Sequence, residues 1–455
     1  MKFGGTSVAD ENAIRRVTAI VRQQIERQPE GDAPPLVVVS ALSKVTDGLL
    51  QVARFMEGGE RDRAIERLNE LADRHVAIAS VVAGGARLAA VIRDLRAEFA
   101  LTSEMVRALS ALHEVSPRLL DAIASTGELA SSRLVAAALA ESGVPSVWVD
   151  AREVMRTDAE YTSAAPDIAA TCARAQETLA PVAARGEVAV LGGFIGATSD
   201  GVTTTLGRGG SDYSAAIFGA CLDVSEIQIW TDVDGMLTAD PRVVPHPRLV
   251  PQLSFAEASE LAYFGAKVLH PSTILPAVSK NIPVRILNSR QPDAAGTLIT
   301  ANPQPSEGTL TALACKRDVT VIDITSTRMF MAHGFLSRVF EVFERFKTPV
   351  DVVTTSEVSV SVTVDDARRV ETIIDNLRAF AEVSQEREMA IICAVGEDIH
   401  EDPRAFGRAV SALESIPLRM VSQAASRRNI TFVVRNADVP EAMARLHDAF
   451  FGTTS

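Results

Sequence analysis

The sequence predicts an α/β domain, with a mostly parallel sheet and helices on both faces, followed by two smaller α+β modules. Over residues 1–300, short apolar runs rich in β-branched residues alternate with helical patterns, as they do in parallel sheets. Residues 301–317 are expected to be a linker, because the first half contains two prolines and few apolar side chains. Beyond it, one order of strands and helices occurs twice, over 318–388 and 389–455, which predicts two related modules.

The first domain is expected to begin with a strand that ends near Lys2 and to continue into a helix over about 8–28. Five more strands are predicted from short runs of β-branched residues, at 36–39, 147–149, 188–191, 227–230 and 284–287. Between 49 and 140 the pattern is almost entirely helical, with an interruption at Ser125, Thr126 and Gly127. We expect this helical layer to cover a substrate pocket.

The two C-terminal modules are predicted from a repeated order of elements. In the first, strands are expected at 319–324, 350–353 and 358–364, and helices at 334–346 and 366–380. In the second, strands are expected near 391, at 420–423 and at 430–434, and helices at 404–413 and 439–450. Pro349 and Pro417 occupy matching positions in the two copies, which supports the repeat.

The composition excludes several classes of protein. The 455 residues are 47% hydrophobic and 23% charged, which is typical of globular proteins with sizeable cores. A formal net charge of −13 argues against nucleic acid or a membrane as a partner. No apolar run has the length of a membrane span and no signal-peptide pattern appears, so we expect a cytoplasmic protein.

Cysteine and histidine spacing predicts neither a disulfide framework nor a metal site. The four cysteines lie more than 40 residues apart and form no paired motif, so we expect free buried thiols in a reducing compartment. The seven histidines show no spacing typical of metal ligands. No residue is therefore assigned as a metal ligand.

The segment 203–212 has the composition of a loop that binds an anion. Its three glycines allow the backbone to approach a ligand closely, Arg208 supplies a bidentate cation, and a Ser-Asp pair opens an apolar helix over 213–221. A helix N-terminus presents unpaired N–H groups and a partial positive charge. A plain glycine-rich turn with a Ser/Asp helix cap would also suit these residues.

A second loop of this kind occupies residues 2–7, where a lysine precedes Gly4, Gly5 and a Thr-Ser pair. A plain strand-turn-helix corner would explain the glycines but not the lysine directly before them. Two such loops imply a large polyanionic ligand. Neither matches the P-loop pattern or the dinucleotide-binding fingerprint, so those folds are disfavoured.

A series of features occurs along the chain in a fixed order. These are the two loops, the Trp-Thr-Asp-Val-Asp-Gly strand end at 230–235, the segment 264–271 and the tandem modules. In these features and in their order, the chain resembles the aspartate kinases. The resemblance is strongest to the monofunctional lysine-sensitive type, in which a catalytic domain of the amino-acid-kinase fold precedes two ACT domains, and it spans essentially the whole chain. It implies ATP-dependent phosphorylation of the β-carboxylate of L-aspartate to 4-phospho-L-aspartate, with Mg²⁺. This reaction is the first step toward lysine through diaminopimelate, threonine and methionine.

The resemblance also implies partners. Lysine is expected to be an allosteric inhibitor, and whether threonine also inhibits is left open. A homo-oligomer is expected, as a dimer through the ACT domains or as a tetramer.

The resemblance implies catalytic roles for Lys2 and Asp212. Lys2 would bind the β- and γ-phosphates, and Asp212 would organise Lys2 with magnesium or a bound water. Arg208 would bind an aspartate carboxylate. The remaining substrate-binding residues would be Thr46, Glu128, Phe194 and Ser211. The residues expected at the nucleotide, besides Lys2, are Gly4, Gly5, Thr6, Gly209, Gly210, Thr231, Asp232, Arg242 and Lys267. A carboxylate substrate is already nucleophilic near neutral pH, so positioning and neutralisation matter more than base catalysis.

The resemblance further implies a lysine site in the first ACT domain. Asp351 and Glu357 would offer negative charge to an ammonium group, and the helix that starts at Gly334 would offer N–H groups to a carboxylate. The expected effector-binding residues are Met329, Phe335, Leu336, Val350, Asp351, Thr355, Ser356 and Glu357. A plain βαβ corner would produce the same apolar pattern.

Two alternatives are weighed against this function. Another carboxylate kinase of the amino-acid-kinase fold, such as a glutamate or acetylglutamate kinase, would reuse the phosphate loops. The tandem modules and the Ser-x-x-Thr segment that ends at Thr46 count against it. A catalytically inactive amino-acid-sensing regulatory protein is the second alternative, and the intact Lys2, Arg208 and Asp212 count against it.

Overall fold

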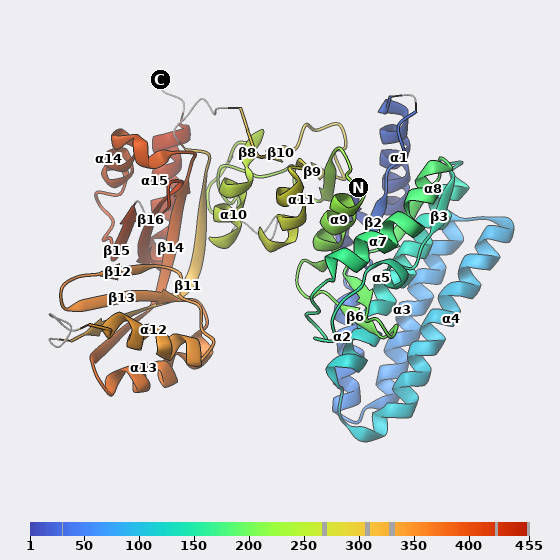
Figure 1. The fold of residues 1–455 in the computed structure, drawn as a ribbon, viewed down its shortest axis with the longest axis horizontal. Helices are drawn as coiled ribbons and strands as arrows, with labels where there is room; N and C mark the ends of the chain where they lie inside the picture. The colour runs from blue at the N-terminus through green and yellow to red at the C-terminus, as the bar shows by residue number, and fades with distance from the viewer. Residues whose placement is uncertain (30, 266–270, 305–309, 327–332, 424–425, 453–455) are drawn as a thin grey trace. The chain divides into compact units, whose positions relative to one another are not determined.

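The computed structural model describes all residues except 30, 266–270, 305–309, 327–332, 424–425 and 453–455. The chain divides into two compact units (Figure 1). The first comprises Met1–Gly235 and Leu269–Ala301, and the second comprises Met236–Val268 and Asn302–Ser455. The segment 236–268, expected within the first domain, therefore packs with the C-terminal modules. Among the described residues, no helix has both the length and the apolar character needed to cross a membrane.

The first unit is built on a mostly parallel sheet, as predicted. Its strands are β1 (Lys2–Phe3), β2 (Val37–Val39), β3 (Ser146–Trp148), β4 (Val188–Gly192), β7 (Ile227–Thr231), β9 (Val284–Asn288) and β10 (Thr297–Thr300). Within this unit their order is β3-β4-β2-β1-β7-β9-β10, and of these only β10 pairs antiparallel. The five further strands predicted from β-branched runs are confirmed to within one residue at each end. The hairpin of β5 (Ile195–Ala197) and β6 (Thr203–Thr205) was not predicted.

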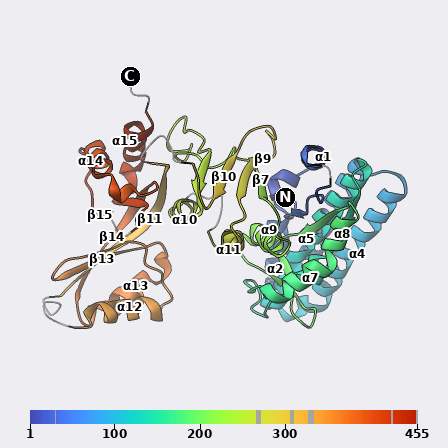
Figure 2. The same cartoon turned by 45° about the horizontal axis from the view of Figure 1, so that its top comes forward.

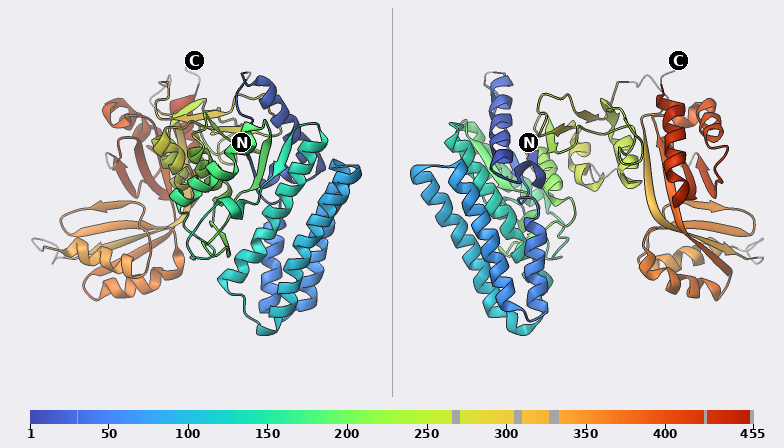
Figure 3. Two further views of the ribbon diagram at one scale, coloured as in Figure 1. Left: turned by 45° about the vertical axis from the view of Figure 1, so that its right-hand side comes forward. Right: turned by 180° about the vertical axis from the view of Figure 1, so that it is seen from behind.

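Helices cover both faces of this sheet. They are α1 (Glu11–Arg27), α2 (Val45–Glu57), α3 (Arg61–Val82), α4 (Gly85–Leu109), α5 (Pro117–Glu141), α6 (Ala151–Val154), α7 (Ile168–Thr178), α8 (Ala180–Ala184), α9 (Gly210–Cys221) and α11 (Leu275–Lys280). Side chains alternate along β2, so Val37 and Val39 join the core under α1 to α5, whereas Val38 joins the core under α6 to α9. Figure 3 shows the blue-to-teal helices α2 to α5 lying side by side.

The predicted interruption of the helical layer at Ser125, Thr126 and Gly127 is wrong, because these residues lie inside α5. Their polar groups are satisfied without breaking the helix. The Ser125 hydroxyl donates to the Ala122 carbonyl at 2.8 Å, and the Thr126 hydroxyl pairs with that of Thr102 at 2.8 Å. Packing within the bundle therefore overrides the local turn signal.

The first helix begins later than predicted. Residues 5–8 form a 3₁₀ turn (Gly5–Val8), and α1 starts at Glu11 because the Asp10 side chain accepts a hydrogen bond from the Ala13 N–H at 2.8 Å. The Thr-Ser pair of the glycine loop at residues 2–7 lies within this 3₁₀ turn.

The expectation of four free thiols is wrong for one pair. Cys172 of α7 and Cys221 at the end of α9 form a disulfide, with their Cα atoms 4.6 Å apart. The two helices pack against each other on one face of the sheet, which brings together residues 49 apart in sequence. Cys315 and Cys393 are free, and burial raises the pKa of the Cys315 thiol to about 11.

The second unit is organised around a six-stranded antiparallel sheet in the order β12-β13-β11-β14-β16-β15. The strands are β11 (Ala312–Thr325), β12 (Val353–Thr355), β13 (Ser359–Val364), β14 (Glu382–Val395), β15 (Met420–Gln423) and β16 (Asn429–Arg435). The helices are α12 (Phe335–Arg345), α13 (Val370–Arg378), α14 (Pro403–Ala412) and α15 (Val439–Phe451), preceded in the chain by β8 (Gln252–Ser254) and α10 (Phe255–Tyr263). Figure 2 shows α12 beside α13 against one part of the sheet and α14 beside α15 against another.

The repeated order of elements is confirmed, and two strands are shared between the modules. The second half of β11 pairs with β13, whereas Ala312–Lys316 of its first half pairs with Ile391–Val395 of β14. Residues 312–317, expected in a linker, are thus part of a strand that completes the second module. Two separate cores result, one under α12 and α13 and one under α14 and α15.

Candidate active site

All of the predicted catalytic and substrate-binding residues line one pocket of about 590 Å³ in the first unit. The pocket lies where β1, β2 and β4 end and where the first turns of α2 and α9 meet α5. The predicted residues in its lining are Lys2, Gly5, Thr46, Glu128, Phe194, Arg208, Gly209, Gly210, Ser211 and Asp212. The carboxyl ends of parallel strands are the usual position of ligand sites in such sheets.

A buried ion pair joins the two glycine loops. The Lys2 Nζ of β1 lies 2.7 Å from the Asp212 Oδ1 in the first turn of α9, and the two side chains are 10% and 17% exposed. Gly209 caps α9 in the left-handed region, with φ of 74°, which glycine adopts without strain. A lysine ammonium and a helix N-terminus therefore converge at one place, which favours a negatively charged ligand.

The amides of the two loops differ in their availability. The Gly4 N–H donates to the Trp230 carbonyl at 3.0 Å, and the Gly210 N–H donates to the Gly207 carbonyl at 3.0 Å. These two amides were predicted to hold phosphate and are instead engaged within the protein. Gly5 and Gly209 have no recorded backbone acceptor among the described residues. A side chain at Gly5 would place its Cβ 2.9 Å from the Ala41 carbonyl oxygen, so this turn requires glycine.

Glu128 presents a carboxylate without a cationic partner. Its Oε1 accepts a hydrogen bond from the Ala41 N–H at 3.2 Å, while its buried Oε2 has no partner in the described part of the chain. Burial raises the pKa of Glu128 from its ordinary 4.5 to about 8. Because a buried carboxylate oxygen is costly to leave unpaired, this arrangement suits a cationic ligand group.

Arg208 supplies the opposite charge across the same pocket. Its side chain is exposed and has no recorded hydrogen bond or ion pair among the residues described. The nearby Phe194 adopts a φ of 66°, held by hydrogen bonds to the Ser214 hydroxyl and from the Leu206 N–H, both 2.9 Å. A backbone held in this sparsely populated region often marks a functional position. Arg208 therefore offers a cation, and Glu128 a buried carboxyl, to a ligand that carries both a carboxylate and an ammonium group, as an amino acid does.

The residues predicted to bind the nucleotide are spread over the two units. Thr231 and Asp232 lie at the end of β7, which neighbours β1, and the Thr231 carbonyl accepts from the Ser289 N–H at 2.8 Å. Thr6 is exposed in the 3₁₀ turn. Arg242 belongs to the second unit and pairs with Asp240 at 2.6 Å. Lys267 lies outside the described residues.

The predicted effector residues lie around the start of α12 and around β12. Phe335 is buried against Phe380, Leu336 is exposed, and Ser356 pairs with Ser359 through hydroxyls 2.7 Å apart. Val350 is half-buried, Thr355 and Glu357 are exposed, and Met329 lies outside the described residues.

Asp351 has the most side-chain contacts of these effector residues. Its Oδ1 accepts from the Tyr263 hydroxyl at 2.8 Å and from the Lys316 Nζ at 2.9 Å, and Lys316 also pairs with Asp365 at 2.7 Å. The buried Oδ2 of Asp351 has no partner in the described part.

The sequence reasoning missed several residues of the pocket. Ser40, Lys44, Asp121, Thr162 and Thr205 also line it. One signal was available for Asp121, which precedes Glu128 by seven residues on one helix and therefore lies two turns away on the same face.

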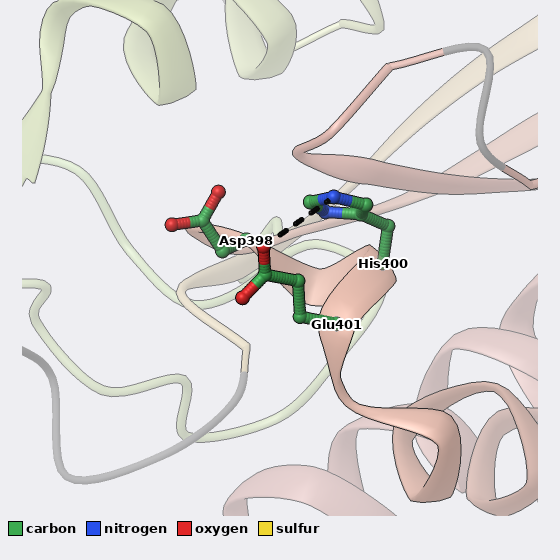
Figure 4. Close-up of side chains that lie close together, drawn as sticks. All are labelled: Asp398, His400 and Glu401. Atoms are coloured by element: carbon green, nitrogen blue, oxygen red, sulfur yellow. Dashed lines mark ion pairs between the residues drawn. The ribbon is translucent and has the colours of Figure 1, made fainter.

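A group of potential metal ligands lies in the second unit, away from any predicted site. Figure 4 shows the side chains of Asp398, His400 and Glu401 close together. The Arg427 guanidinium lies 3.2 Å from the Asp398 carboxylate and 3.8 Å from that of Glu401, so a positive charge already faces the group. The side chains are also partly exposed, and we assign no metal to them.

Comparison with protein families agrees with this geometry. The model of the amino acid kinase family matches residues 1–288, and that of the ACT domain matches residues 392–450. The lysine-sensitive aspartokinase 3 of Escherichia coli is 38% identical over 99% of this chain and 98% of its own length. The chloroplastic aspartokinase 3 of Arabidopsis thaliana is 36% identical over 100% of this chain and 81% of its own length.

Solved structures extend the similarity to the whole fold. The crystal structure of E. coli aspartokinase III in complex with aspartate and ADP has a TM-score of 0.83 at 37% identity and covers 98% of both chains. The structure of the same enzyme in complex with lysine and aspartate has a TM-score of 0.80 at 37% identity, with 99% of this chain and 98% of the other covered.

Proposed function

The chain belongs to the aspartokinases, and we propose that it transfers the γ-phosphoryl group of ATP to the β-carboxylate of L-aspartate. One observation carries the proposal: the pocket combines a Lys2–Asp212 pair at the glycine loops with an unpaired Glu128 and an unpaired Arg208. The first pair suits a phosphate donor. The second suits a small amino acid with a negatively charged side chain.

The substrate is held by charge complementarity. Glu128 would accept the α-ammonium of aspartate, which supplies the missing partner for its Oε2 and lowers the pKa that burial has raised. Arg208 would bind a carboxylate through two parallel N–H donors. Thr46, Phe194 and Ser211 would complete the walls of this part of the pocket. The β-carboxylate then faces the glycine loops as the attacking nucleophile.

Transfer depends on positioning and charge neutralisation rather than on a general base, because the attacking carboxylate is already ionised. Lys2, held by Asp212, would stabilise the negative charge that develops on the transferring group, together with the free amides of Gly5 and Gly209. Carboxylate and phosphate oxygens are the ligands that Mg²⁺ prefers, so Asp212 and the phosphates of ATP fit a magnesium ion that would neutralise the phosphates. Asp212 orients these groups and does not receive the phosphoryl group.

The nucleotide would extend from the glycine loops toward the end of β7. Thr231 and Asp232 are suited to contact it there, because β7 lies beside β1 in the sheet. Arg242 and Lys267 are proposed as further ATP-side residues on the family resemblance. ATP is also the reason that we propose a cytoplasmic enzyme, since this donor is held inside cells.

We propose a catalytic domain over 1–300 and ACT domains over 318–388 and 389–455. The family matches over 1–288 and 392–450 support this division, and the linker would end before β11 begins at Ala312. Exposed apolar side chains on α12 and β12, among them Leu336, Phe340 and Val353, support a homodimer formed through the first ACT domain, and a tetramer is the alternative.

Lysine is proposed as the allosteric inhibitor, bound around the start of α12 and at Asp351. The buried and unpartnered Oδ2 of Asp351 is suited to the effector's ammonium. Because Asp351 also holds Tyr263 of α10 and Lys316 of β11, an ammonium that draws on its charge would weaken those bonds. Inhibition requires that lysine bind the less active arrangement more tightly than the active one.

The test is a coupled assay of ATP consumption with L-aspartate, L-glutamate and N-acetylglutamate, each with and without lysine or threonine. We expect turnover with aspartate alone, and inhibition by lysine. Turnover with glutamate or N-acetylglutamate but not with aspartate would favour another carboxylate kinase. Lysine binding without turnover of any substrate would favour a regulatory protein.

A further inference from the structure

Asp121 accepts more hydrogen bonds than the other carboxylates that line the pocket, and it is not one of the residues proposed to contact a substrate. It lies in α5, two turns before Glu128, and is almost completely buried. Burial raises its pKa, although its hydrogen bonds act in the opposite direction. Burying a carboxylate without a cationic partner lowers the stability of the fold, and such groups are often kept because they serve a function.

The Asp121 carboxylate joins two segments that are distant in sequence. Its Oδ2 accepts from the Thr205 N–H at 3.0 Å and from the Thr162 N–H at 2.9 Å, and its Oδ1 accepts from the Thr205 hydroxyl at 2.6 Å. Thr205 is the last residue of β6, and Thr162 belongs to the loop between α6 and α7. Hydrogen bonds to an ionised acceptor are short and strong, so this clamp fixes both segments to α5.

The clamp lies directly before the residues that contact the ligands. Arg208 follows Thr205 by three residues, and Gly209 then caps α9, which carries Asp212. The loop supports this turn from the other side, since the Ala164 N–H donates to the Thr205 carbonyl at 2.9 Å and the Thr162 carbonyl lies against Gly207. The Arg208 side chain has no recorded partner among the described residues, so this backbone is what sets the point from which it reaches into the pocket.

We propose that Asp121 is a positioning residue that holds the Thr205–Gly209 turn so that Arg208 points at the substrate carboxylate. The inference rests on the proposed function, because it assigns Asp121 to the aspartate side of the same site. It predicts that losing the clamp weakens aspartate binding more than ATP binding, because Lys2 and Gly5 lie outside the turn and Gly209 is its last residue.

The test compares Asp121→Asn with Asp158→Asn as a matched control. Asp158 is exposed and accepts from the Glu160 and Ala165 N–H groups of the same loop, but it has no recorded contact with β6. In Asp121→Asn an amide replaces an oxygen that faces N–H donors. We expect the KM for aspartate to rise about tenfold or more, because a misplaced Arg208 would bind the substrate carboxylate poorly. The KM for ATP should change less than about twofold. Asp158→Asn should resemble the wild type.

A double-mutant cycle separates positioning from a general structural role. If Asp121 acts through Arg208, Asp121→Asn should lower kcat/KM for aspartate strongly in the wild type and little in the Arg208→Ala background. Equal effects in both backgrounds, or an equal rise in the KM for ATP, would overturn the proposal. An unchanged KM for aspartate in Asp121→Asn would do the same.

Two further measurements apply if Asp121→Asn folds poorly or if the protein does not phosphorylate aspartate. Thr205→Val removes only the hydroxyl donor, and it should raise the KM for aspartate in the same direction by a smaller factor. Its failure to do so would count against the clamp. If the wild type shows no aspartate-dependent turnover, the proposed function fails, and calorimetric titration of aspartate into wild type and Asp121→Asn still decides the positioning role.

Discussion

Replacement of Glu128 by glutamine tests whether the buried Glu128 carboxyl lowers the free energy of unfolding of the protein. The carboxyl is buried with one hydrogen bond, from the Ala41 N–H, and burial raises its pKa from 4.5 to about 8. At about 1.4 kcal/mol for each pKa unit, this difference corresponds to roughly 5 kcal/mol of unfolding free energy. We treat it as an upper limit, because water in the open pocket lowers the cost of desolvation.

The sign of the effect follows from which state holds the proton. In the unfolded chain Glu128 ionises above about pH 4.5, whereas in the folded protein it keeps its proton up to its pKa of about 8. The folded state therefore binds more protons between these values, so the free energy of unfolding falls as pH rises and the loss is complete above about pH 8. Glutamine does not ionise. Glu128→Gln should be increasingly more stable than the wild type across this range.

The assay is thermal unfolding of both proteins without ligands, at several values between about pH 5 and pH 9. Each kcal/mol should appear as a difference of about 2–4 °C in Tm. Glu104→Gln, at an exposed position of α4, is the matched control and should show no pH-dependent gain. A Tm difference for Glu128→Gln that stays constant over the whole range would refute the reasoning.

The same group is proposed to bind the substrate, which gives a pH prediction, and three further predictions concern its neighbours and the effector. In the wild type kcat/KM for aspartate should rise with pH toward the pKa of Glu128 near 8, and initial rates at low aspartate check this. Lys2→Ala and Asp212→Ala should each lower kcat about a hundredfold, equivalent to about 3 kcal/mol, while the folded state survives; a near wild-type kcat at saturating substrates would contradict the catalytic assignment. Arg208→Lys should raise the KM for aspartate more than that for ATP, because an ammonium lacks the guanidinium fork; equal rises would move Arg208 to the nucleotide side. Asp351→Ala should stay active without lysine and need about tenfold more lysine for half inhibition; superimposed inhibition curves would place the effector elsewhere.

Strands such as β2 and β4 of the first unit could be predicted from sequence because all of their residues are buried. Val37–Val39 is continuously apolar, and its short run of β-branched residues between two prolines and Ser40 favours a strand over a helix. The β5–β6 hairpin was missed for the opposite reason. It is short, and Gly196 and three threonines give it no hydrophobic pattern.

Features that depend on contacts between distant segments could not be predicted from the sequence. The Cys172–Cys221 disulfide joins helices that only the fold brings together, and the sharing of β11 between two modules depends on its pairing with β14 along most of its length. The residues of the site also fall into those with a local sequence pattern and those known only from their contacts. Lys2 and Arg208 were visible because each stands near glycines, whereas Asp121 was marked by no more than its seven-residue spacing from Glu128, and its role follows from what it contacts.

The two halves of the pocket are prepared differently, and this follows from what each must bind. On the phosphate side, Lys2 is already paired with Asp212 in a buried contact, so the cation is held in place before ATP arrives and little reorganisation is needed during transfer. On the proposed aspartate side, Glu128 and Arg208 have no charged partners in the described part of the chain, and Asp121 holds the turn that carries Arg208. An ionised Glu128 without a partner is costly in this buried position, and a ligand that pairs it would recover that free energy on binding. Glutamate carries the same charges as aspartate but places its side-chain carboxylate one methylene further away, so a rigidly held Thr205–Gly209 turn would favour the shorter substrate. Loosening the turn through Asp121→Asn should therefore reduce the preference for aspartate over glutamate as well as the affinity for aspartate, and the ratio of kcat/KM for the two substrates measures that preference.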